Sequence, residues 1–200
     1  MHTAPALAHS RELTNEEKIK AIRYHFHEIM VTLGLDLTDD SLKDTPARVA
    51  SMFVNEAFAG LDPANEPDIT LFENKFKYNE IVLERDIPLY SYCEHHFVPI
   101  IGKAHIAYVS KGQVIGLSKL NRITEYFAKR PQVQERLTIQ IAGYLKQVMD
   151  IEDVAVIVKA EHLCVASRGV RHTGCTTVTS SMHGAFLAER GQELDRMLGI

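Results

Sequence analysis

The 200-residue chain contains no tryptophan and only three cysteines. An odd, small number of cysteines argues against a disulfide framework and leaves them for metal binding, catalysis or burial. No apolar run reaches the roughly 18 residues that span a bilayer, and residues 1–18 lack the charged-then-apolar layout of a signal peptide. We therefore expect a cytoplasmic protein with no membrane partner.

An excess of positive charge is also missing. Lysine and arginine total 22 against 26 aspartates and glutamates, which gives a formal net charge of −4. This balance excludes a general attraction to nucleic acid or to an anionic membrane, so an anionic ligand needs a local cluster of cations. The chain does contain ten histidines, which together with the free cysteines direct attention to metal sites.

Two amphipathic helices are predicted before residue 61. Thr14 and Glu17 form a Thr-x-x-Glu capping box ahead of apolar residues at helical spacing. In the second helix, residues 41–58, Thr45 is the expected N-cap and Pro46 the first helical residue.

The rest of the chain reads as strands and helices in separate blocks. Strands are predicted from Ile81 to 93, over 102–109 and 113–117 as a hairpin, and over 153–169 and 172–180; helices are predicted over 118–130, over 132–150 and from about Ala185. Segregated helices and antiparallel strands indicate an α+β fold. We divide the chain into an N-terminal helical region, residues 1–70, and a second domain, residues 71–200.

Cysteine and histidine come together in the motif Cys93-Glu94-His95-His96 at the end of a predicted strand. The spacing of Cys93 and His96 allows both to bind one ion from a turn. Cys164 is the candidate third ligand, because it shares strand parity with His162.

Two thiolates and one imidazole suit Zn²⁺ better than Mg²⁺ or Ca²⁺, and three protein ligands leave a fourth position for water, as in catalytic zinc sites. His95 and His162 remain beside this site as candidate proton carriers. The structural alternative is a closed zinc site in which Cys175 supplies a fourth ligand.

A candidate anion site lies at the start of the helix after Gly116. Ser118, Lys119 and Arg122 gather there with free backbone N–H groups, and Arg168 follows Cys164 by four residues. These residues are equally typical of solvated charges at a helix start. Gln134 and Glu135 begin the next predicted helix, where a carboxylate is able to bind the edge of a guanine, but a glutamate in a first helical turn more often only complements the helix dipole.

Four segments of the chain resemble, in order and spacing, signature blocks of the GTP cyclohydrolase I family: SYCEHHFVPIIGKAHIAYV, GLSKLNRI, QVQERLTIQIA and EHLCVASRGV. The resemblance runs from about residue 14 to the C-terminus. It implies the tunnelling fold, a four-stranded antiparallel sheet with two long helices on one face, preceded by N-terminal helices. It also implies a homodecamer of two stacked pentamers with active sites at subunit interfaces.

The activity that the resemblance implies is zinc-dependent opening of the purine ring of GTP, release of formate and formation of 7,8-dihydroneopterin triphosphate, the first step of tetrahydrofolate and pterin biosynthesis. On matching positions, it implies zinc ligands at Cys93, His96 and Cys164 and catalytic histidines at His95 and His162. It implies guanine contacts at Gln134 and Glu135, and triphosphate or ribose contacts at Ser118, Lys119, Arg122, Arg168 and, across a subunit interface, Arg48.

The sequence argues against two related enzymes and leaves one alternative from a different class. A nitrile reductase of the same fold relies on a nucleophilic cysteine and a nicotinamide cofactor without zinc, and GTP cyclohydrolase II carries a tighter three-cysteine cluster that this chain lacks. A non-catalytic zinc-binding regulatory module, with Cys175 closing the site, is the alternative from a different class.

Overall fold

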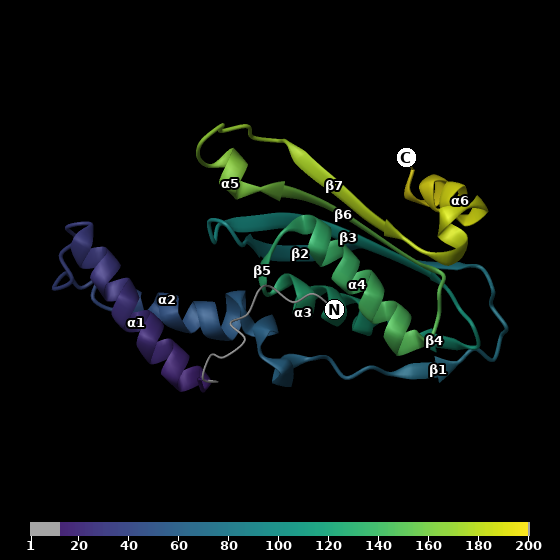
Figure 1. Cartoon of the computed structure of the whole chain (residues 1–200), viewed down its shortest axis with the longest axis horizontal. Helices are drawn as coiled ribbons and strands as arrows, with labels where there is room; N and C mark the ends of the chain where they lie inside the picture. The colour runs from purple at the N-terminus through teal and green to yellow at the C-terminus, as the bar shows by residue number, and fades with distance from the viewer. Residues whose placement is uncertain (1–12, 200) are drawn as a thin grey trace.

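The computed structural model describes residues 13–199 and has an α+β fold, as the sequence predicts (Figure 1). Residues 1–12, the beginning of the predicted N-terminal region, and Ile200 lie outside the described part. The main helices are α1 (Asn15–Thr32), α2 (Thr45–Met52), α3 (Leu117–Ala128), α4 (Gln134–Met149), α5 (Leu163–Ala166) and α6 (Glu189–Leu198). The strands are β1 (Leu71–Glu73), β2 (Ile81–Cys93), β3 (Pro99–Val109), β4 (Gln113–Ile115), β5 (Pro131–Gln132), β6 (Val154–His162) and β7 (Thr176–Met182).

The main sheet has the strand order β5-β2-β3-β6-β7. The long strands β2, β3, β6 and β7 pair antiparallel in that order, and the two-residue β5 runs parallel to the end of β2. The predicted hairpin of 102–109 with 113–117 is wrong, because β4 pairs with β1 in a separate two-stranded sheet. Asn74, directly after β1, binds the turn that precedes β4. Its backbone N–H donates to the carbonyl of Gly112, and its side-chain amide donates to Ser110 Oγ.

Helices α3 and α4 cover one face of the main sheet, and the alternating residues of β6 explain why (Figure 1). Val154, Val156 and Val158 are fully buried in the cluster that both helices share. On the opposite face, Ala155 and Ile157 pack in a second cluster that contains Phe186 and Leu194 of the C-terminal segment. The sheet therefore has a core on both faces of β6.

Three local expectations need correction. The capping box of Thr14 and Glu17 is present, but the second helix has Asp44 at its N-cap instead of Thr45. In the helix predicted over 132–150, helical spacing groups Ile139 with the apolar residues Ala142 and Leu145 on one face, but Ile139 is 61% exposed and Ile141 is buried instead. Residues 163–166 form a helical turn instead of extending the strand.

Strand β6 ends at His162 because its partner ends there. His162 pairs with Ile100, one residue after the start of β3, so the following residues have no ladder to join. They close a turn instead, in which the backbone N–H of Ser167 donates to the carbonyl of Leu163. Cys164 therefore projects from α5, and strand parity is not what orients it.

The short 3₁₀ segments Ala59–Leu61, Pro63–Asn65 and Gly184–Leu187 and a π-helical turn, Phe53–Ala57, complete the regular structure. The N-terminal helices α1 and α2 extend away from the sheet (Figure 1). Within residues 13–199, every helix is too short or too polar to cross a membrane.

Candidate metal and substrate site

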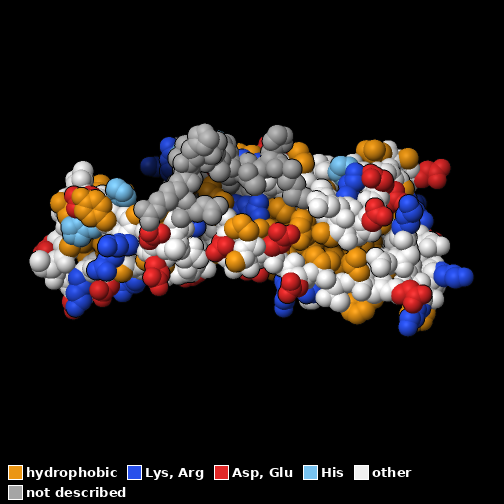
Figure 2. All heavy atoms as spheres, turned by 60° about the horizontal axis from the view of Figure 1, so that its bottom comes forward, with side chains coloured by type: hydrophobic (Ala, Val, Ile, Leu, Met, Phe, Trp, Pro, Cys, Tyr) orange, Lys and Arg blue, Asp and Glu red, His pale blue; other side chains and the backbone are white. Residues whose placement is uncertain are grey.

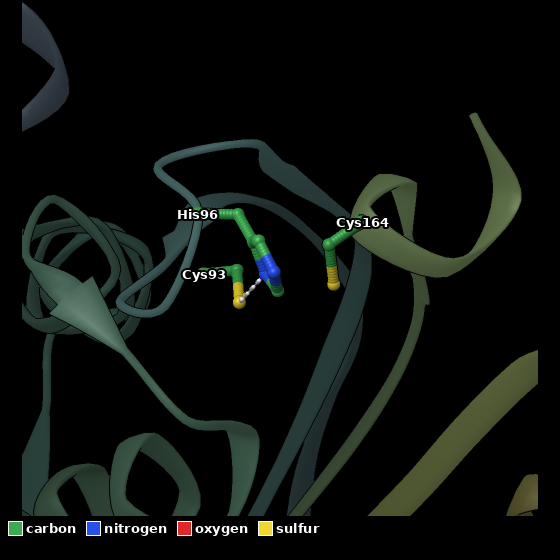
Figure 3. Close-up of side chains that lie close together, drawn as sticks. All are labelled: Cys93, His96 and Cys164. Carbon is green, nitrogen blue, oxygen red and sulfur yellow. Dashed lines mark hydrogen bonds between the residues drawn. The ribbon is translucent and has the colours of Figure 1, made fainter. Parts of the chain in front are cut away.

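Cys93, His96 and Cys164 meet at one end of the main sheet (Figure 3). Cys93 is the last residue of β2, His96 lies in the turn that follows, and Cys164 comes from α5. One donor atom from each residue lies within 4.8 Å of the other two, and Cys93 Sγ is 3.9 Å from His96 Nδ1. The three side chains point toward one another, as the sequence predicts for ligands of one ion.

The tight turn after β2 explains why Cys93 and His96 face the same side. The carbonyl of Cys93 accepts from the backbone N–H groups of His96 and Phe97 at 3.3 and 2.8 Å, and the N–H of Cys93 donates to the carbonyl of Val98. Phe97 has a φ of 52°, a left-handed conformation that is uncommon for an aromatic residue. The chain reverses within a few residues and returns as β3.

The donor set fits a tetrahedral zinc ion. Ligand bonds of about 2.1 and 2.3 Å place neighbouring donor atoms about 3.6–3.8 Å apart, close to the 3.9 Å between Cys93 Sγ and His96 Nδ1. Burial raises the pKa of the Cys164 thiol, the adjacent Cys93 raises it further, and Arg168 opposes this. A cation offsets the cost of ionising two neighbouring thiols. Cys175 is exposed and lies outside this group of donors among the described residues.

His162 lies two residues before Cys164, and its ring is oriented by Gln134. The side chain of Gln134 is buried, and its Nε2 donates to the carbonyls of Val158 and Thr177, both at 3.0 Å, and to Thr179 Oγ1 at 3.1 Å. Three acceptors around the amide nitrogen leave Gln134 Oε1 facing His162 Nε2 at 2.8 Å. His162 therefore carries its proton on Nε2, and its Nδ1 is left with a free lone pair.

Charge and burial act in opposite directions on His162. Burial lowers the pKa of its imidazole, and the carboxylate of Glu135 partly reverses this shift. Glu135 is exposed in the first turn of α4. The side-chain amide of Gln134, a predicted guanine contact, is turned into the protein and makes its hydrogen bonds there.

His95 is exposed beside the metal ligands. Its Nδ1 lies 3.7 Å from Cys93 Sγ, and its Nε2 lies 3.9 Å from a carboxylate oxygen of Glu94. His95 is therefore open to solvent, whereas His162 is partly buried.

Sequence reasoning missed the ion pair between Glu94 and Arg136. Arg136, on α4, bonds to the carboxylate of Glu94 at 2.6 Å and is only 17% exposed. The available signal was a charged residue placed between metal ligands, with an arginine at the start of a helix otherwise rich in buried residues.

The predicted anion-binding residues are not gathered around the metal ligands in this chain. The C-terminal end of α3 is beside the site, because the carbonyl of Ala128 accepts from Ser91 Oγ at 2.7 Å. Ser118 and Lys119 are at the other end of that helix, roughly 15 Å away along its axis.

The other predicted phosphate contacts are dispersed as well. Arg122 lines a separate cavity of about 460 Å³ with Glu66 and Lys129. Arg48, on α2, donates to the carbonyl of Ser41. Arg168 is close enough to Cys164 to lower the pKa of its thiol, which places this predicted phosphate-binding cation near the metal donors.

Comparison with known proteins places the chain in a family. A sequence model described as GTP cyclohydrolase I matches residues 22–198. A protein of Flavobacterium johnsoniae named GTP cyclohydrolase 1 is 56% identical over 175 residues, which cover 88% of this chain and 78% of the relative. A protein of the same name from Aeromonas salmonicida is 53% identical over 188 residues, 94% of this chain and 86% of the relative.

Among solved structures, the archaeosine synthase QueF-Like in its apo form aligns with a TM-score of 0.44 and 15% identity, over 52% of this chain and 94% of the other. That weak likeness adds nothing to the assignment, which rests on the sequence match along nearly the whole length. The chain belongs to the GTP cyclohydrolase I family.

Proposed function

We propose that this protein is a GTP cyclohydrolase I, which opens the purine ring of GTP by hydrolysis, releases formate and forms 7,8-dihydroneopterin triphosphate. The observation that carries the proposal is the meeting of Cys93, His96 and Cys164 beside His162 in a member of this family. The product would serve as the first intermediate of tetrahydrofolate and pterin biosynthesis. A non-catalytic zinc module is not favoured, because Cys175 stands outside the donor group.

Zinc is the proposed cofactor, held by the two thiolates and by Nδ1 of His96. A zinc ion with three protein ligands supplies a Lewis acid that makes water an effective nucleophile at neutral pH. The protein's part is to present a donor set that excludes hard cations such as Mg²⁺ and to hold the reacting carbon of the purine nearby.

Proton transfer is assigned to His162 and His95. His162 offers the lone pair of Nδ1, because Gln134 Oε1 engages the proton on its Nε2. Its pKa is lowered by burial, which keeps the ring neutral and able to accept a proton near pH 7. His95, exposed at 3.7 Å from Cys93 Sγ, is placed to exchange protons with solvent. Ring opening and ring closure need several proton transfers, which explains two carriers.

Glu135 is the proposed guanine anchor. Its carboxylate is exposed, close enough to His162 to affect the pKa of that ring, and able to accept two hydrogen bonds from the N1–H and 2-amino edge of guanine. Arg168 is the proposed phosphate or ribose contact within the same chain, since arginine binds phosphate oxygens bidentately.

The remaining phosphate contacts are proposed to come from a second copy of the chain. Ser118 and Lys119 are separated from the metal donors by most of α3, which favours contact with a substrate bound at a neighbouring subunit. We extend this to Arg122 and to Arg48 on α2, and propose a homodecamer with active sites at its interfaces. Hydrophobic side chains are exposed in several places on the face drawn in Figure 2. Ile29, Val31 and Leu33, at the C-terminal end of α1, are more than half exposed and support self-association.

The finer description of the fold belongs to the same proposal. The antiparallel strands β2, β3, β6 and β7, with α3 and α4 on one face, are compatible with a tunnelling fold. We propose residues 71–200 as the catalytic domain and residues 1–70 as the helical region that completes the assembly. Three free cysteines are compatible with a reducing cytoplasm.

The proposal is tested by incubating the zinc-loaded protein with GTP and measuring formate and, after oxidation, pterin fluorescence. We expect both products in equal amounts from GTP and neither from ATP. Formate without pterin would indicate a hydrolase that stops after ring opening, and the absence of both products from assembled, zinc-loaded protein would refute the function.

Shared sites are tested by mixing two inactive variants. Cys164→Ser removes a metal ligand and Ser118→Ala/Lys119→Ala removes the distant phosphate contacts. If each active site takes its metal ligands from one subunit and Ser118 and Lys119 from another, co-refolded mixtures should recover part of the activity. Some interfaces then combine intact metal ligands from one variant with intact phosphate contacts from the other. Activity that stays absent in mixed oligomers would show that both groups act within one chain.

A further inference from the structure

Arg136 connects helix α4 to the turn that carries two of the three metal donors. Its Nε donates to Gln132 Oε1 at 2.9 Å, and one terminal nitrogen donates to Glu94 Oε2 at 2.6 Å and to the carbonyl of Pro131 at 2.8 Å. Glu94 lies between Cys93 and His96 in sequence. The guanidinium therefore holds the middle of the chelating turn, with a bond to each of three separate groups.

The groups that Arg136 contacts are themselves held in place. Gln132 is buried, and its Nε2 donates to the carbonyl of Phe127 and to Gln140 Oε1 at 2.8 and 2.9 Å. Its carbonyl accepts from the backbone N–H of Glu94 at 3.0 Å, and β5 pairs with the end of β2. The turn is thus attached by both backbone and side chain to the segment that leads into α4.

The ion pair of Arg136 and Glu94 is less exposed than an ordinary surface ion pair. The side chains of Arg136 and Glu94 are 17% and 25% exposed, and the short distance is that of a charge-assisted hydrogen bond. The ion pair of Arg190 with Glu80 has the same 2.6 Å length, but Glu80 is 60% exposed and precedes β2, at the end of that strand opposite to Cys93, while Arg190 lies on α6. It offers a matched control of equal chemistry away from the metal donors.

We propose that Arg136 is a positioning residue for the metal site, which acts through Glu94 to hold Cys93 and His96 in chelating geometry. The inference deepens the proposed function and rests on its metal site. Without the pair, the turn gains freedom that metal binding must remove, so the cost appears as weaker metal affinity. The first turn of α4 then serves both halves of the site, with Gln134 orienting His162 and Arg136 orienting the chelating turn.

The experiment measures zinc affinity by competition with a chromogenic chelator, which needs no GTP turnover. The variants are Arg136→Met, Glu94→Gln, their double combination and the control Arg190→Met, together with the conservative Arg136→Lys. We expect Arg136→Met and Glu94→Gln each to weaken zinc binding by about 10- to 100-fold, as for loss of partners that orient metal ligands. The control should bind zinc as tightly as the parent.

The double variant decides whether the two residues act as one unit. If Arg136 acts on the metal site only by holding Glu94, the double variant should bind zinc no more weakly than the single variant of lower affinity. The second change then removes no further interaction. Arg136→Lys should recover part of the affinity, since a lysine reaches Glu94 but not all three acceptors. Urea unfolding of the metal-free proteins shows whether a variant has lost its fold. If Arg136→Met does not fold, the zinc affinity of Glu94→Gln, which keeps the side-chain volume, tests the role of the ion pair.

Three results would overturn the inference: zinc affinity in Arg136→Met within twofold of the parent, losses that multiply in the double variant, or an equal loss in Arg190→Met. A parent protein that fails to bind zinc would remove the metal site and this inference together. A parent that binds zinc but does not convert GTP would remove the proposed function alone, and the affinities would still decide the role of Arg136.

Discussion

We expect Gln134→Leu to destabilise the fold as well as to impair catalysis, although the new side chain is apolar and of similar size. Gln134 is 1% exposed, and its amide satisfies two backbone carbonyls, a threonine hydroxyl and the N–H of His162. Leucine makes none of these hydrogen bonds. The buried groups around it are left with fewer partners than they have in the parent protein.

The size of the effect follows from these contacts. Two donated protons are lost at roughly 1 kcal/mol each, and the half-buried N–H of His162 loses its acceptor at about 1–3 kcal/mol. Thr179 Oγ1 keeps its contact with Thr138 Oγ1 at 2.7 Å, which limits the loss. We therefore expect the free energy of unfolding to fall by about 3–5 kcal/mol.

Urea unfolding of the metal-free protein, followed by circular dichroism, measures this loss. Gln113→Leu is the matched control, because Gln113 is exposed on β4 and its replacement should change stability by less than about 0.5 kcal/mol. If Gln134→Leu is no less stable than Gln113→Leu, the inward orientation of the amide is wrong. The assignment of the free lone pair to His162 Nδ1 would then fail with it.

Four other outcomes are expected. Cys164→Ser should bind zinc at least tenfold more weakly in chelator competition, since a thiolate donor is lost; unchanged affinity would exclude it as a ligand. His162→Ala should retain zinc and lose at least about 100-fold in pterin formation, and loss of the metal instead would mean that its role is misassigned. Glu135→Ala should raise KM for GTP about tenfold or more with zinc content unchanged, and an unaltered preference for GTP over ATP would exclude the guanine anchor. Burial lowers the pKa of His105, whose Nδ1 accepts from the backbone N–H of Asp86, so its contribution to stability is present above the unfolded pKa of about 6.5 and is lost as pH falls. His105→Gln should accordingly lose less stability than the parent between pH 7.5 and 5 in urea unfolding, and an equal loss would refute this sign.

The sequence was sufficient to predict that Cys93 and His96 lie together, because their signal is local. Cys93 and His96 are joined by one turn, and a turn of this length places both on one side. Cys164 was predicted on strand parity, whereas the structure presents it from a helical turn after β6 ends. The structure does bring Cys164 to Cys93 and His96, but for a reason other than strand parity.

Long-range pairing is what the sequence could not predict. The pattern of residues 113–115 predicts the second strand of a hairpin, yet this segment pairs with residues 71–73. Asn74 contributes to this pairing, because its backbone N–H donates to the carbonyl of Gly112 in the turn before residue 113. The inward side chain of Gln134 depends on acceptors from β6 and β7, more than twenty residues away. The partnership of Glu94 and Arg136 likewise spans 42 positions, so no local pattern in the sequence pairs the two residues with each other.

The most direct test of the account measures GTP conversion before and after removal of the metal. The purified protein is stripped of metal with a chelator, assayed with GTP for formate and for pterin fluorescence, and assayed again after zinc is restored. We expect both products from the loaded protein, neither after stripping, and recovery with one zinc ion per chain. Full activity in the stripped protein would contradict the role of Cys93, His96 and Cys164, and inactivity of the reloaded, assembled protein would contradict the proposed function itself.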